Sequence, residues 1–328
     1  MALDLYVIIG IVLCVTQPVT IIANLLTIIA FKKVPSLQTH TSNLFIFALS
    51  IADFLSGIYQ ISYYGIPFAF SLKPPLGEIG CKMTVPFEYN FYTGNLLLVA
   101  ISIDRVLLLS MDYSKYVKMT TKRRLKVAIG ICVLIGQLGA AIELSIWDYA
   151  TRHSTDIDFD EICLYPSFRV KWFSIYVSLC IYFLPLTLVA IFSIIFFKRL
   201  LIKIRTTRRV KPESHNQESS IETTGGNREE IALEENTRNI STRKRYIKPA
   251  VTLAALVSAM GISMVPYCTY IVVAGAGYPN PEVEYAMYLI LQLNPFLDPL
   301  FFAATQKGVR EYYATKIRGM LRSFCNQN

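Results

Sequence analysis

The chain has 328 residues, of which 53% are hydrophobic and only 17% are charged, and its net charge is +9. This composition is too apolar for a soluble domain of that length. The positive charge would suit a nucleic-acid partner, but its distribution along the chain excludes one and instead follows membrane topology.

Seven apolar stretches that carry few charges follow one another along the chain. They cover residues 5–31, 43–70, 83–109, 127–147, 172–197, 249–274 and 285–304. A helix needs roughly 20 apolar residues to cross the hydrocarbon core, and each stretch is long enough. Because backbone groups cannot stay unpaired in lipid, the stretches must be helices. The sequence therefore predicts an all-α membrane protein, a seven-transmembrane helix bundle over residues 5–304.

The basic residues indicate which way the bundle faces. Of the 32 Lys and Arg residues, 26 lie within 32–33, 115–126, 198–248 and 307–322, which fall on one side if seven helices alternate. By the positive-inside rule, that side is cytoplasmic. Residues 1–4 are then a short extracellular N-terminus and the C-terminus is cytoplasmic, in a multi-pass protein of the plasma membrane. The first stretch lacks a basic region before it, so we expect an uncleaved span rather than a signal peptide.

Two polar segments lie on the predicted cytoplasmic side. Residues 205–242 contain no aromatic residue and are rich in Glu, Ser, Thr and Asn, so we expect a disordered third cytoplasmic loop. Residues 305–328 form the tail, where 307–324 place apolar side chains on one helical face and basic ones on the other. That pattern predicts an amphipathic helix on the lipid surface, with Cys325 beside it as a candidate palmitoylation site.

Acidic residues inside the predicted spans need a partner or a function, because each costs roughly 2.5–3.5 kcal/mol to insert. Asp53 and Asp298 lie in the second and seventh spans, and Asn95 and Asn294 are available to the same interior. Either these groups form a hydrogen-bond network that holds helices together, or two carboxylates share a buried cation such as sodium. We expect no cofactor other than this candidate ion.

Two cysteines lie on the predicted outer side. Cys81 opens the third span and Cys163 precedes the fifth. Both face an oxidising compartment, so a disulfide between them is chemically allowed, and two free thiols are the alternative. At the other end of the third span, Asp104 and Arg105 form an adjacent acid–base pair.

Taken in order, these residues resemble the rhodopsin-like (class A) G-protein-coupled receptors over nearly the whole chain. The matching residues are Asn24, Leu49 to Asp53, the pair Cys81 and Cys163, Asp104-Arg105-Val106, Pro185, Val265-Pro266-Tyr267 and Asp298-Pro299-Leu300-Phe301-Phe302. The resemblance implies that Cys81 and Cys163 form the family disulfide. It also implies an extracellular ligand, a heterotrimeric G protein that couples at Asp104 and Arg105, and arrestin as a further partner.

Within that family the chain resembles the amine receptors, particularly the histamine and muscarinic groups. Cys81-Lys82-Met83 followed by Glu88-Tyr89 is similar to their Cys-Lys-Leu followed by Asp-Tyr. The resemblance implies that Glu88 pairs with the ammonium group of a small ligand. Further ligand contacts are expected from Tyr89, Tyr92, Tyr267, Tyr270, Tyr288 and Gln292. These rings suit an aromatic cage around a cation, although tyrosines near a helix end also form interfacial belts, to which we assign Tyr63 and Tyr64.

The chain also departs from the family pattern. From Cys81 to Arg105 is 24 residues, one fewer than usual, so that Phe87 takes the amine-pairing position when the helix is aligned from Arg105. Met264 replaces the sixth-helix Trp, and the residues at the foot of that helix are basic, which leaves Arg105 no acid there. We therefore expect signalling without ligand. Two further departures act in the opposite direction. Ser193 and Phe302 replace tyrosines whose hydroxyl groups would support the active state, so their absence would weaken that state.

Other functions fit less well. A receptor for a peptide or a lipid is the first alternative, because the fifth span offers Ser178 but has Val177 and Ile181 where an amine's ring would need polar partners. A cation-coupled transporter would show repeats or broken helices at matching positions. An opsin is excluded because residues 285–304 contain no Lys, and an enzyme is excluded because the three His residues are scattered through loops.

Overall fold

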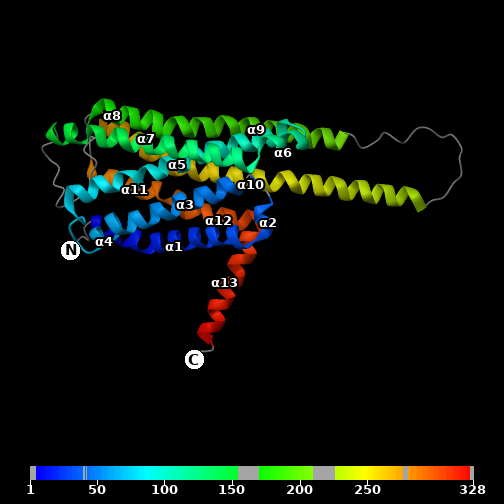
Figure 1. Ribbon diagram of the computed structural model, residues 1–328, viewed down its shortest axis with the longest axis horizontal. Helices are drawn as coiled ribbons and strands as arrows, with labels where there is room; N and C mark the ends of the chain where they lie inside the picture. Colours follow the sequence, from blue (N-terminus) through cyan, green and yellow to red (C-terminus); the bar gives the residue numbers. More distant parts are fainter. Residues whose placement is uncertain are drawn as a thin grey trace.

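The computed structural model describes residues 5–39, 41, 43–153, 170–209, 226–275 and 280–325. Every regular element within these ranges is a helix. Seven helical segments are long and apolar enough to cross a membrane. They lie side by side along one axis, and a further helix, α13, leaves the bundle at a steep angle (Figure 1). The fold is therefore the predicted all-α bundle of seven membrane helices.

The elements follow the order of the predicted spans. They are α1 (Leu5–Lys33), α2 (Pro35–Gln38), α3 (Asn43–Gln60), η1 (Ile61–Gly65), α4 (Ile66–Ala69), α5 (Gly77–Ser110), α6 (Tyr113–Met119), α7 (Lys122–His153), α8 (Lys171–Tyr176), η3 (Val177–Phe183), α9 (Leu184–Arg209), α10 (Gly226–Gly275), α11 (Pro281–Leu291), α12 (Leu293–Thr305) and α13 (Lys307–Cys325). The end of the bundle at which α4, α8 and α11 lie is called the N-terminal end, and the end with α2, α6 and α13 the α13 end (Figure 1).

Helical structure extends into the segment that was expected to be a disordered loop. α9 continues to Arg209 and α10 begins at Gly226, so the prediction of disorder is wrong for residues 205–209 and 226–242. Good helix formers such as Arg, Glu, Ala and Leu fill these residues. Since each stretch joins a membrane helix, it needs no nucleation step of its own. Residues 210–225 lie outside the described part of the chain.

The second and fifth spans each contain a π-helical turn, η1 and η3 respectively. Pro67 and Pro185 follow these turns, and each proline lacks an N–H while its ring would clash with the carbonyl four residues before it. Those carbonyls belong to Tyr63 and Ile181, which lie inside η1 and η3. A wider turn relieves the clash and rotates the residues that precede it relative to a regular α-helix.

The seventh span is interrupted rather than continuous. α11 ends at Leu291 and α12 begins at Leu293. Pro295 cannot donate a hydrogen bond to the carbonyl of Leu291, which explains the break at this point. The carbonyl of Pro295 instead accepts a hydrogen bond from Nδ2 of Asn24 in α1, at 3.2 Å. The break therefore ties the seventh span to the first.

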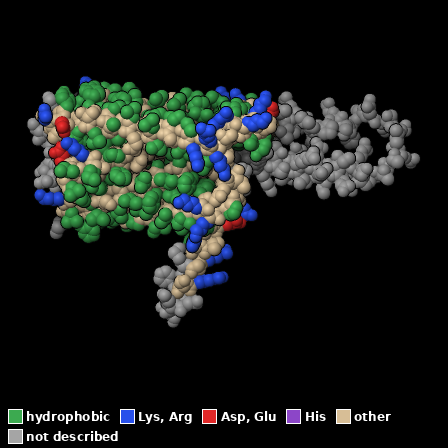
Figure 2. All heavy atoms as spheres, viewed as in Figure 1, with side chains coloured by type: hydrophobic (Ala, Val, Ile, Leu, Met, Phe, Trp, Pro, Cys, Tyr) green, Lys and Arg blue, Asp and Glu red, His purple; other side chains and the backbone are tan. Residues whose placement is uncertain are grey.

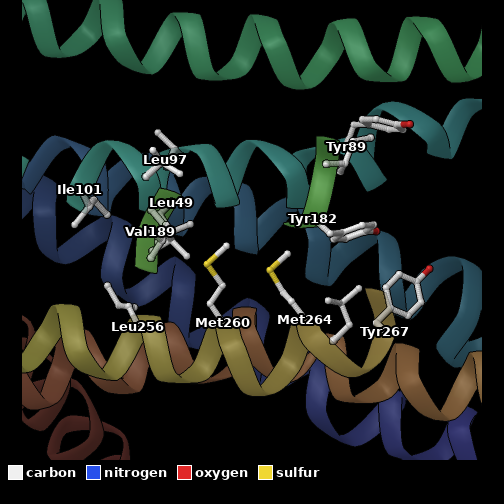
Figure 3. Packing of buried hydrophobic residues seen from close by; sticks show 14 of the residues in the cluster. Leu49, Tyr89, Leu97, Ile101, Tyr182, Val189, Leu256, Met260, Met264 and Tyr267 are labelled. Atoms are coloured by element: carbon white, nitrogen blue, oxygen red, sulfur yellow. The ribbon is translucent and has the colours of Figure 1, made fainter. Parts of the chain in front are cut away.

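The bundle carries apolar side chains both inside and outside. Leu49, Leu97, Val189, Leu256 and Met260 meet in the interior between α3, α5, α9 and α10 (Figure 3). Hydrophobic side chains also cover the flank of the bundle, while Lys and Arg gather toward the α13 end (Figure 2). An apolar flank of this extent is expected where helices face lipid.

Candidate functional site

Glu88 of α5 faces the interior of the bundle. It is half-buried, and its Oε2 accepts a hydrogen bond of 3.0 Å from the hydroxyl of Tyr59 in α3. Phe87, one residue earlier and therefore about 100° around the helix, is 42% exposed on the flank. Of the two residues that the sequence left open for this position, the structure thus turns the carboxylate inward and the phenyl ring outward.

Five tyrosines form a continuous group beside Glu88, and we call them the tyrosine cluster. Its members are Tyr59, Tyr64, Tyr182, Tyr267 and Tyr288, all buried, from α3, η1, η3, α10 and α11. The ring centroids are 5.7 Å apart for Tyr59–Tyr64, 5.3 Å for Tyr64–Tyr288, 6.2 Å for Tyr267–Tyr288 and 5.5 Å for Tyr182–Tyr267. Such spacings are those of favourable aromatic pairs.

The cluster is polar as well as aromatic. Because the single hydroxyl hydrogen of Tyr59 goes to Glu88, the hydroxyl of Tyr64, 3.1 Å away, donates to that of Tyr59, and Tyr288 donates to Oε1 of Gln60 at 2.9 Å. Glu88 lies close enough to interact electrostatically with the hydroxyls of Tyr182, Tyr267 and Tyr288. The arrangement therefore joins one carboxylate to several ring faces inside the N-terminal half of the bundle, a combination that suits an organic cation.

The structure separates two predicted ligand residues from this cluster. Tyr89 points toward α7, away from Tyr182 and Tyr267 (Figure 3), and its hydroxyl donates to Oε2 of Glu143 at 3.4 Å. The hydroxyl of Tyr270 bonds to the backbone O and N of Asn280, at 2.9 and 3.0 Å, and so joins α10 to the start of α11.

Tyr92 and Gln292 are the other two predicted ligand residues. The hydroxyl of Tyr92 donates to the carbonyl of Cys180 in η3 at 3.5 Å, and Gln292 is buried at the break between α11 and α12. Among the predicted ligand residues, Tyr267 and Tyr288 belong to the tyrosine cluster, and Glu88 bonds to its member Tyr59. All seven remain predictions as ligand contacts.

Sequence reasoning missed Tyr59, Gln60 and Tyr182, and it assigned Tyr64 to an interfacial belt. Tyr64 is in fact only 4% exposed, whereas Tyr63 is half-buried. The wide turn η1 explains the error, because it changes which side chains of the second span point inward. Pro67 and Pro185 were the available signals, since each marks a place where regular helical periodicity fails.

A second polar group lies deeper in the bundle. Asp53 and Asp298 are both buried and close enough to affect each other electrostatically, so two negative charges there need a proton on one carboxyl group or a cation nearby. Among the described residues, no hydrogen-bond partner is found for either carboxylate oxygen of Asp298, for Oδ2 of Asp53, for Oδ1 of Asn294 or for Oγ of Ser50. Buried oxygens without partners are the ligands that a hard cation such as sodium uses. Asn95 is also buried, but its unpartnered atom is the donor Nδ2, which would not bind a cation.

Asp104 and Arg105 lie buried at the α13 end of α5. Nη1 of Arg105 is 3.4 Å from Oδ2 of Asp104, and Oδ1 of Asp104 accepts a hydrogen bond of 2.8 Å from Tyr116 in α6. The side chains at the foot of α10 lie outside the described residues, so the predicted lack of an acid there stays a prediction. A cleft of about 630 Å³ opens between the end of α5, α6 and α9, lined by residues that include Met111, Lys115 and Lys203.

The cysteines are placed as follows. Cys81 is buried and disulfide-bonded, whereas Cys14, Cys132, Cys180 and Cys268 are free thiols. Cys163 lies outside the described residues, so its pairing with Cys81 stays a prediction. Cys325 is the last residue of α13, and its side chain lies outside the described part of the structure.

Comparisons with known proteins agree with this architecture. The sequence pattern of the 7 transmembrane receptor (rhodopsin family) matches residues 23–302. Muscarinic acetylcholine receptor M3 of Gallus gallus is 26% identical over 239 residues, which cover 70% of this chain and 36% of that receptor. Receptor M5 of Homo sapiens is 27% identical over 151 residues, 46% of this chain and 28% of the relative. Receptor DM1 of Drosophila melanogaster is 32% identical over 118 residues, 36% and 14% respectively.

The seven-helix fold and these matches define an integral membrane receptor that is not an enzyme. The chain belongs to the rhodopsin family of seven-transmembrane, G-protein-coupled receptors. The matched part spans about a third or less of the length of the muscarinic relatives.

Proposed function

We propose that this receptor binds a small extracellular amine at Glu88 and the tyrosine cluster and in response activates a heterotrimeric G protein. The N-terminal end of the bundle is then extracellular and the α13 end cytoplasmic, which agrees with the Lys and Arg side chains that gather at the α13 end (Figure 2). The muscarinic relatives are receptors for acetylcholine, itself a quaternary ammonium compound, and this supports a cationic ligand.

The observation that carries the proposal is the inward-facing carboxylate of Glu88 beside five buried tyrosines. In an interior of low polarity, an ion pair is stronger than in water, and aromatic faces attract an ammonium group further. The hydrogen bond from Tyr59 would hold the carboxylate in position, while Tyr267 and Tyr288 present rings from the opposite helices α10 and α11.

Signal transfer would occur at Asp104 and Arg105. Ligand binding would favour one of two packings of the bundle, and the G protein would favour the same packing from the other end. The cleft between the end of α5, α6 and α9 offers room for a partner segment. Arrestin is a further expected partner, and Cys325 a candidate lipid attachment site.

We also propose that a sodium ion binds between Asp53 and Asp298. The unpartnered oxygens of these residues, Asn294 and Ser50 would hold it. Its single positive charge would offset one of the two buried carboxylates, and a proton would neutralise the other.

The test of the amine site is the response of cells that express the receptor to a panel of biogenic amines, peptides and lipids, read by G-protein dissociation. Glu88→Gln should raise the concentration of an active amine needed for half response by a factor of about 100 or more, because a buried charge would lose its partner. Glu78→Gln is the matched control, since Glu78 lies at the exposed start of the same helix and contacts Lys82. An amine whose potency survives Glu88→Gln would contradict the assignment, and a response to peptides or lipids alone would favour the alternative receptor class.

A further inference from the structure

A groove opens on the flank of the bundle at its α13 end, separate from the sites described above. It has a volume of about 350 Å³ and lies between the end of α1, the short helix α2, and the beginnings of α3 and α7. Its wall is apolar in one part, where Phe31, Leu37, Leu44 and Phe47 line it, and basic in another, where Lys32, Lys122 and Lys126 line it. A groove lined by apolar side chains and by three lysines is the form of site that an amphiphilic anion would fill.

The backbone around the groove is held in place by contacts that do not involve its three lysines. Nε2 of Gln38 donates to the carbonyls of Phe31 and Lys32, at 3.2 and 2.9 Å, and so satisfies the exposed end of α1. Nδ2 of Asn43 donates to the carbonyl of Leu37 at 2.9 Å and fixes α2 against α3. Phe31 and Phe47 pack edge to face, with centroids 6.3 Å apart. The groove is therefore a built feature rather than a gap between loosely placed loops.

The charge in the groove is not compensated by the protein. The lining contains no Asp or Glu, and none of its three lysines forms an ion pair within the described ranges. The first turn of α7, where Lys122 lies, contains no acidic residue either. The partial positive charge at the start of a helix adds to that of Lys122 and Lys126. An anion at this place would meet positive potential from both α1 and α7.

We propose that this groove binds an anionic phospholipid of the inner leaflet, with its phosphate groups held by Lys32, Lys122 and Lys126 and an acyl chain along Phe31, Leu44 and Phe47. The leaflet assignment rests on the orientation given under the proposed function, whereas the site itself does not. Lysine suits a headgroup of this kind because its ammonium binds phosphate as a point charge. The lipid would join the ends of three membrane spans, between which no ion pair is found at this groove among the described residues.

The test is a binding titration of the purified full-length receptor in detergent, with a fluorescent dioctanoyl phosphatidylinositol 4,5-bisphosphate as the probe. Substitution of Lys32, Lys122 and Lys126 by Gln should weaken binding about 100-fold, since each surface lysine contributes roughly fivefold to the attraction of an anionic lipid. The control removes the same charge from Lys118, Lys316 and Arg318, which are exposed and do not line the groove. Its affinity should stay within about threefold of the wild type, as expected for screened charges at a distance.

A second variant separates the groove from surface charge in general. Thr41→Trp would fill the groove while it keeps all three lysines, and it should weaken binding about tenfold or more because the acyl chain loses its apolar wall. Equal losses in the control variant, or full affinity in Thr41→Trp, would show diffuse attraction to charge and overturn the proposal. Equal competition by inositol trisphosphate would show a site for a free phosphate, and equal competition by dioctanoyl phosphatidylcholine a site without charge selectivity. Either result would also overturn it. None of these readouts depends on the ligand or the G protein of the receptor.

Discussion

The close contact between α1 and α4 makes a sharp prediction about stability. A Cβ atom added to Gly10 would lie 2.1 Å from the backbone N of Ala69 and 2.6 Å from the carbonyl carbon of Phe68. Both are backbone atoms, so no side-chain rotation can relieve the overlap, and α1 must move away from α4. This packing matters for the candidate site because α4 continues directly from η1, which carries Tyr64 of the tyrosine cluster.

The magnitude follows from two opposing effects of Gly10→Ala. Overpacking against rigid neighbours costs about 3 kcal/mol, at the upper end of the usual range. The substitution also gains about 1 kcal/mol because alanine favours a helix. The net loss of about 2 kcal/mol should lower the melting temperature by about 4–8 °C, on the scale observed for chains of 150–250 residues.

The matched control is Gly130→Ala in α7. No atom lies within 4 Å of the position that its Cβ would take, so only the helix-forming gain applies. Both variants are heated in the same detergent, and the fraction of protein that still elutes as a monodisperse peak gives the melting temperature of each. Gly10→Ala should melt lower than the wild type, and Gly130→Ala at the same temperature or slightly higher. If Gly10→Ala has the same melting temperature as the wild type, α1 and α4 do not pack as closely as described.

Four other predictions concern the ends and the interior of the bundle. Mass spectrometry of non-reduced peptides should find Cys81 joined to Cys163, and detection of Cys163 as a free thiol in surface-expressed protein would refute the pairing. Replacing choline chloride by sodium chloride should raise the melting temperature of the wild type but not of Asp298→Asn; an equal response in both would contradict the ion site. Cells without added ligand should show G-protein turnover above mock transfection that Arg105→Ala abolishes, and turnover no higher than mock at matched surface expression would rule out basal activity. Tyr116→Phe should alter this signal, because it removes the 2.8 Å hydrogen bond to buried Asp104, worth roughly 1.5–3 kcal/mol.

The membrane fold of this protein could be predicted from the sequence because spanning length is a local property. An apolar run of sufficient length must form a helix in lipid, whatever its neighbours are. The order of Asp53, Asp104-Arg105, Pro185 and Asp298-Pro299 along those runs then sufficed to indicate the receptor family, which the comparison confirms. The start of α10 was harder to predict from the sequence. Its first residues are polar, as in a solvated loop, but many of them also favour a helix, and here they continue a membrane helix.

The tertiary structure alone decided which side chains meet. Glu88 faces Tyr59, whereas Phe87, one residue earlier in the helix, faces outward. The sequence could not decide which of the two faces inward, because spacing counted from Cys81 favours Glu88 and spacing counted from Arg105 favours Phe87. The π turns η1 and η3 brought Tyr64 and Tyr182 inward, and the close packing of α7 directed Tyr89 away toward Glu143. The reason is physical: length and hydropathy set where a helix crosses the membrane, but its rotation depends on the helices packed against it and on local changes of turn that a regular period of 3.6 residues does not contain.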